Sequence, residues 1–249
     1  TQIEAMLAGF GDGGAVAGTS KGGDRASLRL HPEDEQLIAD VAAVCDRAVV
    51  AVMAGSAVVM PWLEAVDAAL MVWYPGSEGG HALADVLLGR AEPGGRLPFA
   101  IPHEESDLVD FDRDAETAVY GLLHGQWHLD ANGMDAHLPF GHGLGYTSFN
   151  LGEAETADDE VVVAVANTGD RAGSTVVQVY GSVPGSTYER PPKRLVGFAK
   201  VRLDAGESTE LRIPVDRSQL DLRIGGAWVQ EGSPVEYSVG FDAATVRRI

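Results

Sequence analysis

The spacing of apolar residues predicts a helix in the first part of the chain. In residues 31–45, Leu37, Ile38, Val41 and Val44 recur at helical spacing, so they share one face. A proline and a run of acidic residues at the beginning of this segment are typical of a helix N-terminus. We therefore expect a helix here with one buried apolar face.

Three apolar runs in the same half of the chain predict strands. Residues 48–55 and 69–76 are typical of strands buried on both faces, and residues 95–102 form a shorter third run. Residues 60–68 and 78–89 lie between these runs and have the pattern of helices. This alternation predicts an α/β domain with a mainly parallel sheet.

From residue 146 onward, apolar and polar positions alternate with a period of two. Residues 160–183 and 193–215 each predict two strands around a turn, and residues 235–244 predict another. Roughly seven short strands at this spacing are typical of a β-sandwich of about 100 residues. The chain is thus predicted to combine an α/β part with an all-β part.

Two segments show neither the helical spacing of apolar residues nor the alternation of a strand. Residues 9–25 are rich in glycine and predict a long loop, and a domain that begins in such a loop is expected to lack its start. Residues 104–139 contain acids and histidines without periodicity, so a connector is expected there.

The acidic balance excludes some partners. The chain has 37 acidic against 18 basic residues, a net charge of −19. A phosphate backbone or an anionic membrane surface would be repelled, so we expect neither nucleic acid nor membrane as a partner. The single cysteine, Cys45, excludes an internal disulfide, and we expect a buried, inert thiol.

Gly76, Gly79 and Gly80 lie between a predicted strand and a predicted helix. This is where α/β sheets often bind ligands, so a phosphate-binding loop is one interpretation. The glycine spacing differs from both common phosphate motifs, and no lysine follows. The pattern favours the alternative, a tight turn that needs the freedom of glycine.

The stretch "WYPGSEGGHALADVLLGRAEPGGRLPFAIP", residues 73–102, resembles a signature of glycoside hydrolase family 3. Residues 55–71 and the stretch "LPFGHGLGYTSF", residues 138–149, are also similar to that family. Segments of the predicted β-sandwich resemble the family's fibronectin-III-like domain. Together the similar segments extend over about residues 20 to 245.

The resemblance implies an architecture. Family members commonly carry a (β/α)8 barrel, an α/β-sandwich domain and often a fibronectin-III-like domain. This chain resembles the later part of the second domain at residues 1–110, a connector at 111–143 and the third domain at 144–249. The implied fold is a partial α/β sandwich with a mainly parallel sheet, followed by a fibronectin-III-like β-sandwich.

The resemblance also implies a function. The chain would be the C-terminal part of a retaining β-glycosidase, similar to β-glucosidases, that hydrolyses terminal β-linked sugars of an oligosaccharide or β-glucoside. The nucleophilic aspartate would lie on a barrel domain or fragment absent from this chain, so the chain alone is expected to be inactive. A non-catalytic structural or carbohydrate-binding module is the alternative. No cofactor or metal is implied, and the compartment stays open.

The resemblance implies a few site residues. In many members an acid/base glutamate precedes a segment similar to "GGDRASLRLHPEDEQLI", so Glu4 is the candidate acid/base. The alternative is an ordinary solvated glutamate. Asp24 and Arg25, within that segment, are expected to form a structural ion pair near the site rather than to contact sugar.

Four other side chains left alternatives open. Glu78 could cap the following helix or line a cleft, and the cap is favoured. His124 and His128 have a spacing that zinc sites use, but no glutamate accompanies them. Trp127 between them could stack on the apolar face of a sugar.

Overall fold

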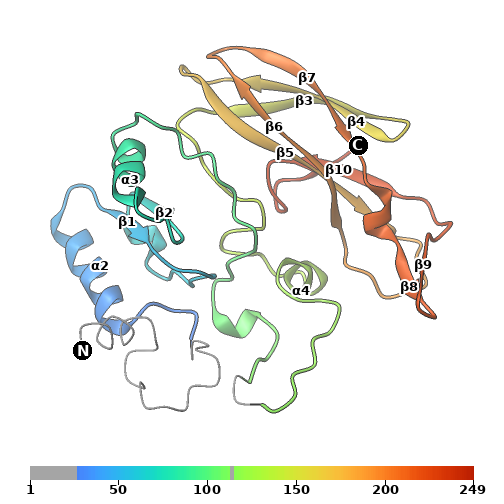
Figure 1. Ribbon diagram of the computed structural model, residues 1–249, viewed down its shortest axis with the longest axis horizontal. Helices are drawn as coiled ribbons and strands as arrows, with labels where there is room; N and C mark the ends of the chain where they lie inside the picture. The colour runs from blue at the N-terminus through green and yellow to red at the C-terminus, as the bar shows by residue number, and fades with distance from the viewer. Residues whose placement is uncertain (1–26, 113–114) are drawn as a thin grey trace. The chain divides into compact units, whose positions relative to one another are not determined.

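The computed structural model describes residues 27–112 and 115–249 (Figure 1). They fall into two compact units. The first comprises the residues up to Gly76 together with Ile101–Tyr120, and the second comprises Ser77–Ala100 and Gly121–Ile249. The domain boundaries expected at residues 110 and 143 stay a prediction.

The first unit contains a helix and a small parallel sheet. Helix α2 spans Pro32–Val44, strand β1 Val49–Val52 and strand β2 Ala68–Met71, with short 3₁₀ turns at Leu63–Ala65 and Glu105–Asp107. The two strands pair in parallel, with Val49 opposite Ala68. The helix predicted at residues 31–45 and two of the predicted strands are thereby confirmed, whereas the helix predicted at residues 60–68 is only a short 3₁₀ turn.

The prediction of a mainly parallel sheet is wrong. In the described ranges the only parallel pairing joins β1 and β2, and residues 95–102 contain no strand longer than an isolated bridge at Ile101. Two prolines in that run carry no N–H for a ladder. Instead, the Leu97 N–H donates to the His142 carbonyl and the Leu97 carbonyl accepts from the Gly141 N–H, both at 2.8 Å.

The apolar positions of the first unit are less buried than their pattern predicted. On α2, Leu37 is 61% and Val44 82% exposed, and Val49 at the start of β1 is 50% exposed. Cys45 is exposed as well, which contradicts the expected buried thiol. The amphipathic pattern set the secondary structure correctly, but the described residues leave this face open.

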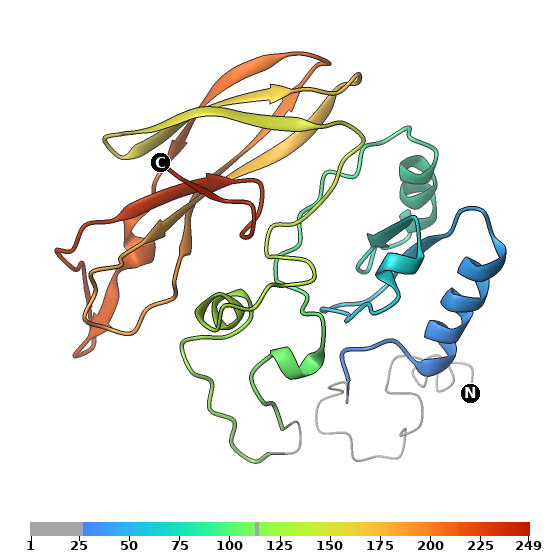
Figure 2. The ribbon, with the colours of Figure 1, turned by 180° about the vertical axis from the view of Figure 1, so that it is seen from behind.

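The second unit combines two helices with a β-sandwich. Helix α3 spans Gly79–Leu87 and helix α4 spans Gln126–Ala131. One antiparallel sheet has the order β3-β4-β7 and the other β11-β10-β5-β6 (Figures 1 and 2). A separate hairpin joins β8 and β9. The strands are β3 (Phe149–Ala157), β4 (Glu160–Asn167), β5 (Gly173–Ser182), β6 (Arg194–Leu203), β7 (Ser208–Pro214), β8 (Leu222–Ile224), β9 (Ala227–Val229), β10 (Glu236–Gly240) and β11 (Arg247–Arg248).

The core of the sandwich lies between the two sheets. Val161, Val163 and Val165 of β4 are fully buried in one cluster with Val177 and Val179 of β5. Because β4 and β5 belong to different sheets, the turn between them crosses the sandwich and does not close a hairpin. The alternation in the sequence therefore predicted the strands, while their pairing follows from burying both apolar faces together.

A buried asparagine holds that crossing turn. Asn167 is 1% exposed. Its Oδ1 accepts from the Thr147 hydroxyl at 2.7 Å and the Gly169 N–H at 3.1 Å. Its Nδ2 donates to the carbonyls of Arg171 at 2.8 Å and Leu203 at 3.2 Å. All the polar groups of this side chain are thus satisfied inside the protein.

Candidate functional site

The catalytic candidate and its neighbours lie outside the described residues. Glu4, Asp24 and Arg25 all precede residue 27, where the description of the structure begins. The acid/base role of Glu4 and the ion pair of Asp24 and Arg25 therefore stay predictions.

The glycine junction has the features of a tight turn. Gly76 has a φ of 72°, a left-handed conformation that favours glycine. Gly79 begins α3, and Glu78 occupies the N-cap position, but its side chain makes no capping hydrogen bond to a backbone N–H of the helix. The Glu78 carboxylate instead lies 2.8 Å from the His81 ring, and both side chains are exposed. The predicted capping bond is therefore wrong, although the position is right.

The two family-like motifs of the second unit bind each other. The loop at residues 140–145 contacts Leu97 through the two backbone hydrogen bonds described above. A Cβ on Gly143 would collide with the carbonyl oxygen of Gly95, and one on Gly145 would collide with the Glu92 carboxylate. The glycines of "FGHGLGY" thus allow this loop to approach the "EPGGRLP" segment closely. We call this paired arrangement the clasp.

Glu92 and Arg96 join the clasp to the sandwich. The Glu92 carboxylate accepts from the Ser174 N–H at 2.7 Å. The Arg96 guanidinium donates to the Thr175 hydroxyl at 2.8 Å and to the Gly143 carbonyl. Burial lowers the pKa of Arg96, against the opposing pull of the Asp242 and Glu92 carboxylates. These contacts give the motif a structural role.

A carboxylate beside the clasp is held in its charged form. The Asp242 carboxylate lies 3.7 Å from the His142 ring and accepts from the Ala244 and Thr245 amides at 3.0 and 2.8 Å. Burial acts to raise the pKa of Asp242, but the hydrogen bonds from His142, Thr245 and Ala244 outweigh it and lower the pKa.

A cavity of about 420 Å³ lies among α4, β5 and the start of β6. Helix α4 contributes Gln126, Trp127 and Asp130 to its wall, and the beginning of β6 contributes Arg194. A volume of this size falls in the range of small-molecule sites, roughly 300–1,000 Å³. The cavity is therefore the candidate binding site of the second unit.

Most polar groups of the cavity are already paired. The Asp130 carboxylate accepts from Lys193 at 2.7 Å and from the Gln126 amide at 2.9 Å. The Gln126 carbonyl oxygen accepts from the Phe140 N–H at 2.9 Å. The Tyr180 hydroxyl donates to Gln178 at 2.6 Å, and burial raises the pKa of Tyr180.

Arg194 differs from these groups. Its guanidinium carbon lies 5.1 Å from the centroid of the Trp127 ring, and His124 makes an edge contact with that ring at 5.6 Å. No ion pair to a carboxylate is recorded for Arg194 within the described ranges. Burial lowers the pKa of Arg194, and the nearby charge of Arg190 lowers it further. Because Arg194 already contacts the Trp127 ring, it covers part of the aromatic surface on which the sequence suggested that a sugar could stack.

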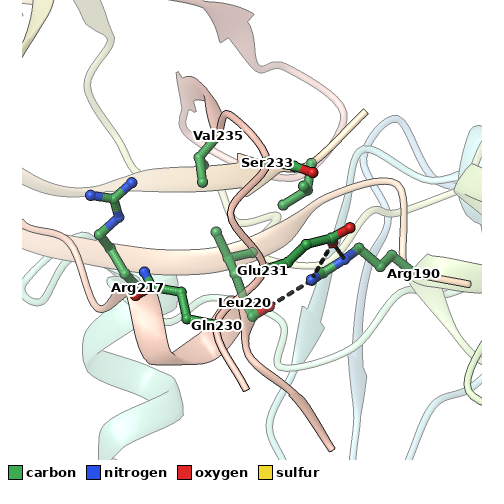
Figure 3. Close-up of a pocket in the computed structure, with 8 residues that line it drawn as sticks. Arg190, Arg217, Leu220, Gln230, Glu231, Ser233 and Val235 are labelled. Atoms are coloured by element: carbon green, nitrogen blue, oxygen red, sulfur yellow. Dashed lines mark hydrogen bonds and ion pairs between the residues drawn. The ribbon is translucent and has the colours of Figure 1, made fainter. Parts of the chain in front are cut away.

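A second, smaller pocket of about 20 Å³ lies beside the β8–β9 hairpin (Figure 3). There the Glu231 carboxylate accepts two hydrogen bonds from Arg190, at 3.1 and 2.9 Å, and Arg190 also donates to the Leu220 carbonyl at 2.6 Å. The pair is nearly buried, with side chains 10% and 15% exposed. A space of this size holds about one water, so this pair anchors the chain and leaves no room for a ligand.

Two further features bear on function. Among the described residues, no group of three or more His, Cys, Asp and Glu side chains is placed to hold a metal ion. In the same part of the chain, we find no helix with the length and apolar character needed to cross a membrane.

Sequence reasoning missed the chemistry of this cavity. It singled out Trp127 and His124 but not Arg194, Lys193 or Asp130. These residues come from segments some 60 positions apart, and only the packing of α4 against the sandwich brings them together. The sequence did contain one signal. Lys193 and Arg194 are adjacent basic residues at the start of a predicted strand, in a chain with a large excess of acidic residues.

Comparison with known proteins identifies the family. A profile of the "Glycosyl hydrolase family 3 C-terminal domain" matches residues 5–146, and one of the "Fibronectin type III-like domain" matches residues 175–243.

Relatives and solved structures agree. A beta-glucosidase of Rhizobium radiobacter is 39% identical over 83% of this chain and 28% of its own length. Beta-glucosidase B of Emericella nidulans is 37% identical over 89% of this chain and 29% of its own. The crystal structure of DesR, a beta-glucosidase from Streptomyces venezuelae, covers 90% of this chain and 31% of its own, with 34% identity and a TM-score of 0.82. The chain thus spans under a third of these proteins, and it belongs to glycosyl hydrolase family 3.

Proposed function

We propose that this chain forms the C-terminal part of a retaining β-glucosidase that hydrolyses terminal β-linked sugars. The observation that carries the proposal is the family match over residues 5–146, supported by relatives named as beta-glucosidases. The substrate is an oligosaccharide or β-glucoside, and the partner is a (β/α)8 barrel.

Retaining hydrolysis requires two carboxyl groups about 5–5.5 Å apart, one as nucleophile and one as acid/base. In this proposal the barrel supplies the nucleophilic aspartate, and Glu4 supplies the acid/base. Asp24 and Arg25 stabilise the loop that follows Glu4. The clasp then acts as a structural joint between the family motif and the sandwich and takes no part in the chemistry.

A chimera tests the proposal. The C-terminal part of the Rhizobium radiobacter beta-glucosidase that matches this chain is replaced by the 249 residues. We expect the chimera to hydrolyse a chromogenic β-glucoside, and the truncated relative and the 249-residue chain to show no turnover when assayed separately.

Two results would count against the proposal. One is a folded, monodisperse chimera that binds glucose but does not hydrolyse the β-glucoside. The other is turnover by the isolated 249-residue chain, which would place a complete catalytic pair within it. Circular dichroism and thermal unfolding of each protein separate loss of activity from loss of structure.

A further inference from the structure

We propose that the cavity among α4, β5 and β6 binds the carboxylate of an organic acid about as large as a monosaccharide, with Arg194 as the anion-binding residue. This proposal concerns a binding site of the described chain and does not depend on hydrolysis. Only the choice of a sugar as the part of the ligand that carries the carboxylate rests on the proposed function.

The charges around Arg194 favour an anionic ligand. The chain has 37 acidic and 18 basic residues, so carboxylates are plentiful as partners. The neighbours of Arg194 follow this expectation, since Arg190 pairs with Glu231 and Lys193 pairs with Asp130. Arg194 is partly buried next to Arg190 without such a pair among the described residues. A bound anion would balance the positive charge of Arg194, and partial burial strengthens the attraction between the two charges.

The balance of hydrogen-bond donors and acceptors in the cavity favours the same kind of ligand. Each acceptor oxygen of Asp130 and Gln126 already receives a hydrogen bond, from Lys193, from Gln126 or from a backbone amide. A cation–π contact uses the charge of Arg194 but none of its N–H groups. The cavity therefore offers a ligand mainly hydrogen-bond donors, the N–H groups of Arg194. A guanidinium can bind a carboxylate through two parallel hydrogen bonds.

The size and the surface of the cavity favour an organic acid over an inorganic anion. A cavity of about 420 Å³ is far larger than a simple inorganic anion needs. Phe99, Phe140 and Trp127 add apolar surface to its wall. The ligand thus needs an apolar face as well as a carboxylate. A hexuronate has both, because the C–H groups of a pyranose form an apolar face.

Calorimetric titration of the full 249-residue chain tests the proposal with three probes: sodium glucuronate, glucose and sodium phenylacetate. We expect glucuronate to bind and glucose to bind at least about tenfold more weakly, because glucose lacks the charge. Binding of phenylacetate as tight as that of glucuronate would support the carboxylate site and show that an apolar acid, instead of a sugar, carries the carboxylate. Failure of both carboxylates to bind, or equal binding of glucose and glucuronate, would overturn the proposal.

A matched pair of variants locates the site. Arg194→Gln should weaken glucuronate binding by about tenfold or more. Arg223→Gln is the control, because Arg223 lies 5.8 Å from the Trp228 ring on the exposed hairpin but does not line the cavity. An unchanged affinity in Arg194→Gln, or an equal loss in both variants, would refute the assignment.

Salt provides a test that needs no variant, in case Arg194→Gln does not fold. Glucuronate binding to the native chain should weaken as sodium chloride is raised, since chloride screens and competes for the guanidinium. Affinity independent of salt would contradict an anion site.

Discussion

At the scale of single residues, Asn167 is a buried polar group whose hydrogen bonds support the sandwich. Its amide joins Thr147, Gly169, Arg171 and Leu203, so it adds hydrogen bonds between segments at the edge of the hydrophobic core. Removing it would leave four buried or partly buried groups without these hydrogen bonds.

We predict that Asn167→Ala lowers the free energy of unfolding by about 3 kcal/mol. Urea denaturation followed by circular dichroism measures the loss. Asn150→Ala is the control, because Asn150 is exposed on β3, and it should cost less than about 0.5 kcal/mol. Equal losses in the two variants would contradict the role of Asn167.

The stability of the sandwich should depend on pH through Asp242. Because its pKa is lowered in the folded state, its stabilising contribution is complete above the ordinary value of 3.8 and is lost as the pH falls through the lowered pKa. We predict that Asp242→Asn is less stable than the wild type at pH 7 and that the difference narrows below about pH 4. Urea denaturation at pH 7, 4 and 3 measures this difference.

The exposed Asp170 supplies the control for that experiment. The free energy of unfolding of Asp170→Asn should differ from that of the wild type by nearly the same amount at all three pH values. A difference between Asp242→Asn and wild type that stays constant from pH 7 to pH 3 would refute the linkage.

Glu4 makes a kinetic prediction in the chimera. An acid/base residue protonates the leaving group, so Glu4→Gln should slow hydrolysis of a β-glucoside with a poor leaving group by about 10²–10⁴-fold. A glucoside with an activated leaving group should be slowed much less, and added azide should restore turnover. Equal slowing of both substrates, without azide rescue, would show that Glu4 has another role.

At the scale of elements, the clasp explains why the signature has its glycines. A side chain on Gly143 would collide with the backbone at Gly95, and no rotamer change relieves a contact with backbone. The same loop receives a hydrogen bond from Arg96 and pairs with Leu97. The spacing of the two motifs therefore reflects one packed joint.

We predict that Gly143→Ala lowers the free energy of unfolding by about 2 kcal/mol or more. Gly185→Ala is the matched control, because a Cβ at Gly185 meets no atom within 4 Å. Thermal and urea unfolding of both variants give the comparison. Wild-type stability in Gly143→Ala would mean that the clasp is loose.

Should Gly143→Ala fail to fold, Arg96→Lys tests the same joint. Lysine keeps the charge but loses the planar fork that reaches both Thr175 and Gly143. A measurable loss of stability is expected, and none would argue against the clasp.

At the scale of the whole molecule, the sequence predicted local structure better than packing. The alternation of Val161, Val163 and Val165 identified a strand, and the apolar spacing of residues 31–45 identified a helix. These features depend on neighbours along the chain. The strand expected at residues 95–102 failed because its backbone bonds go to a distant loop instead of a ladder.

The candidate cavity was beyond sequence reasoning for the same cause. Arg194 and Trp127 meet only after α4 and β6 are placed, and no motif announces their contact. The exposed apolar face of α2 shows the converse limit, since a pattern predicts that a face is apolar but not what covers it.

The proposal that the nucleophile lies on a barrel outside this chain is tested most directly by finding which residue carries the covalent glycosyl-enzyme intermediate. The chimera is incubated with an activated 2-deoxy-2-fluoro-β-glucoside, which slows release of the glycosyl-enzyme, and the labelled peptide is identified by mass spectrometry. We predict one sugar adduct on an aspartate of the barrel and none on the 249 residues. An adduct on a carboxylate of this chain, or hydrolysis without any adduct, would contradict it.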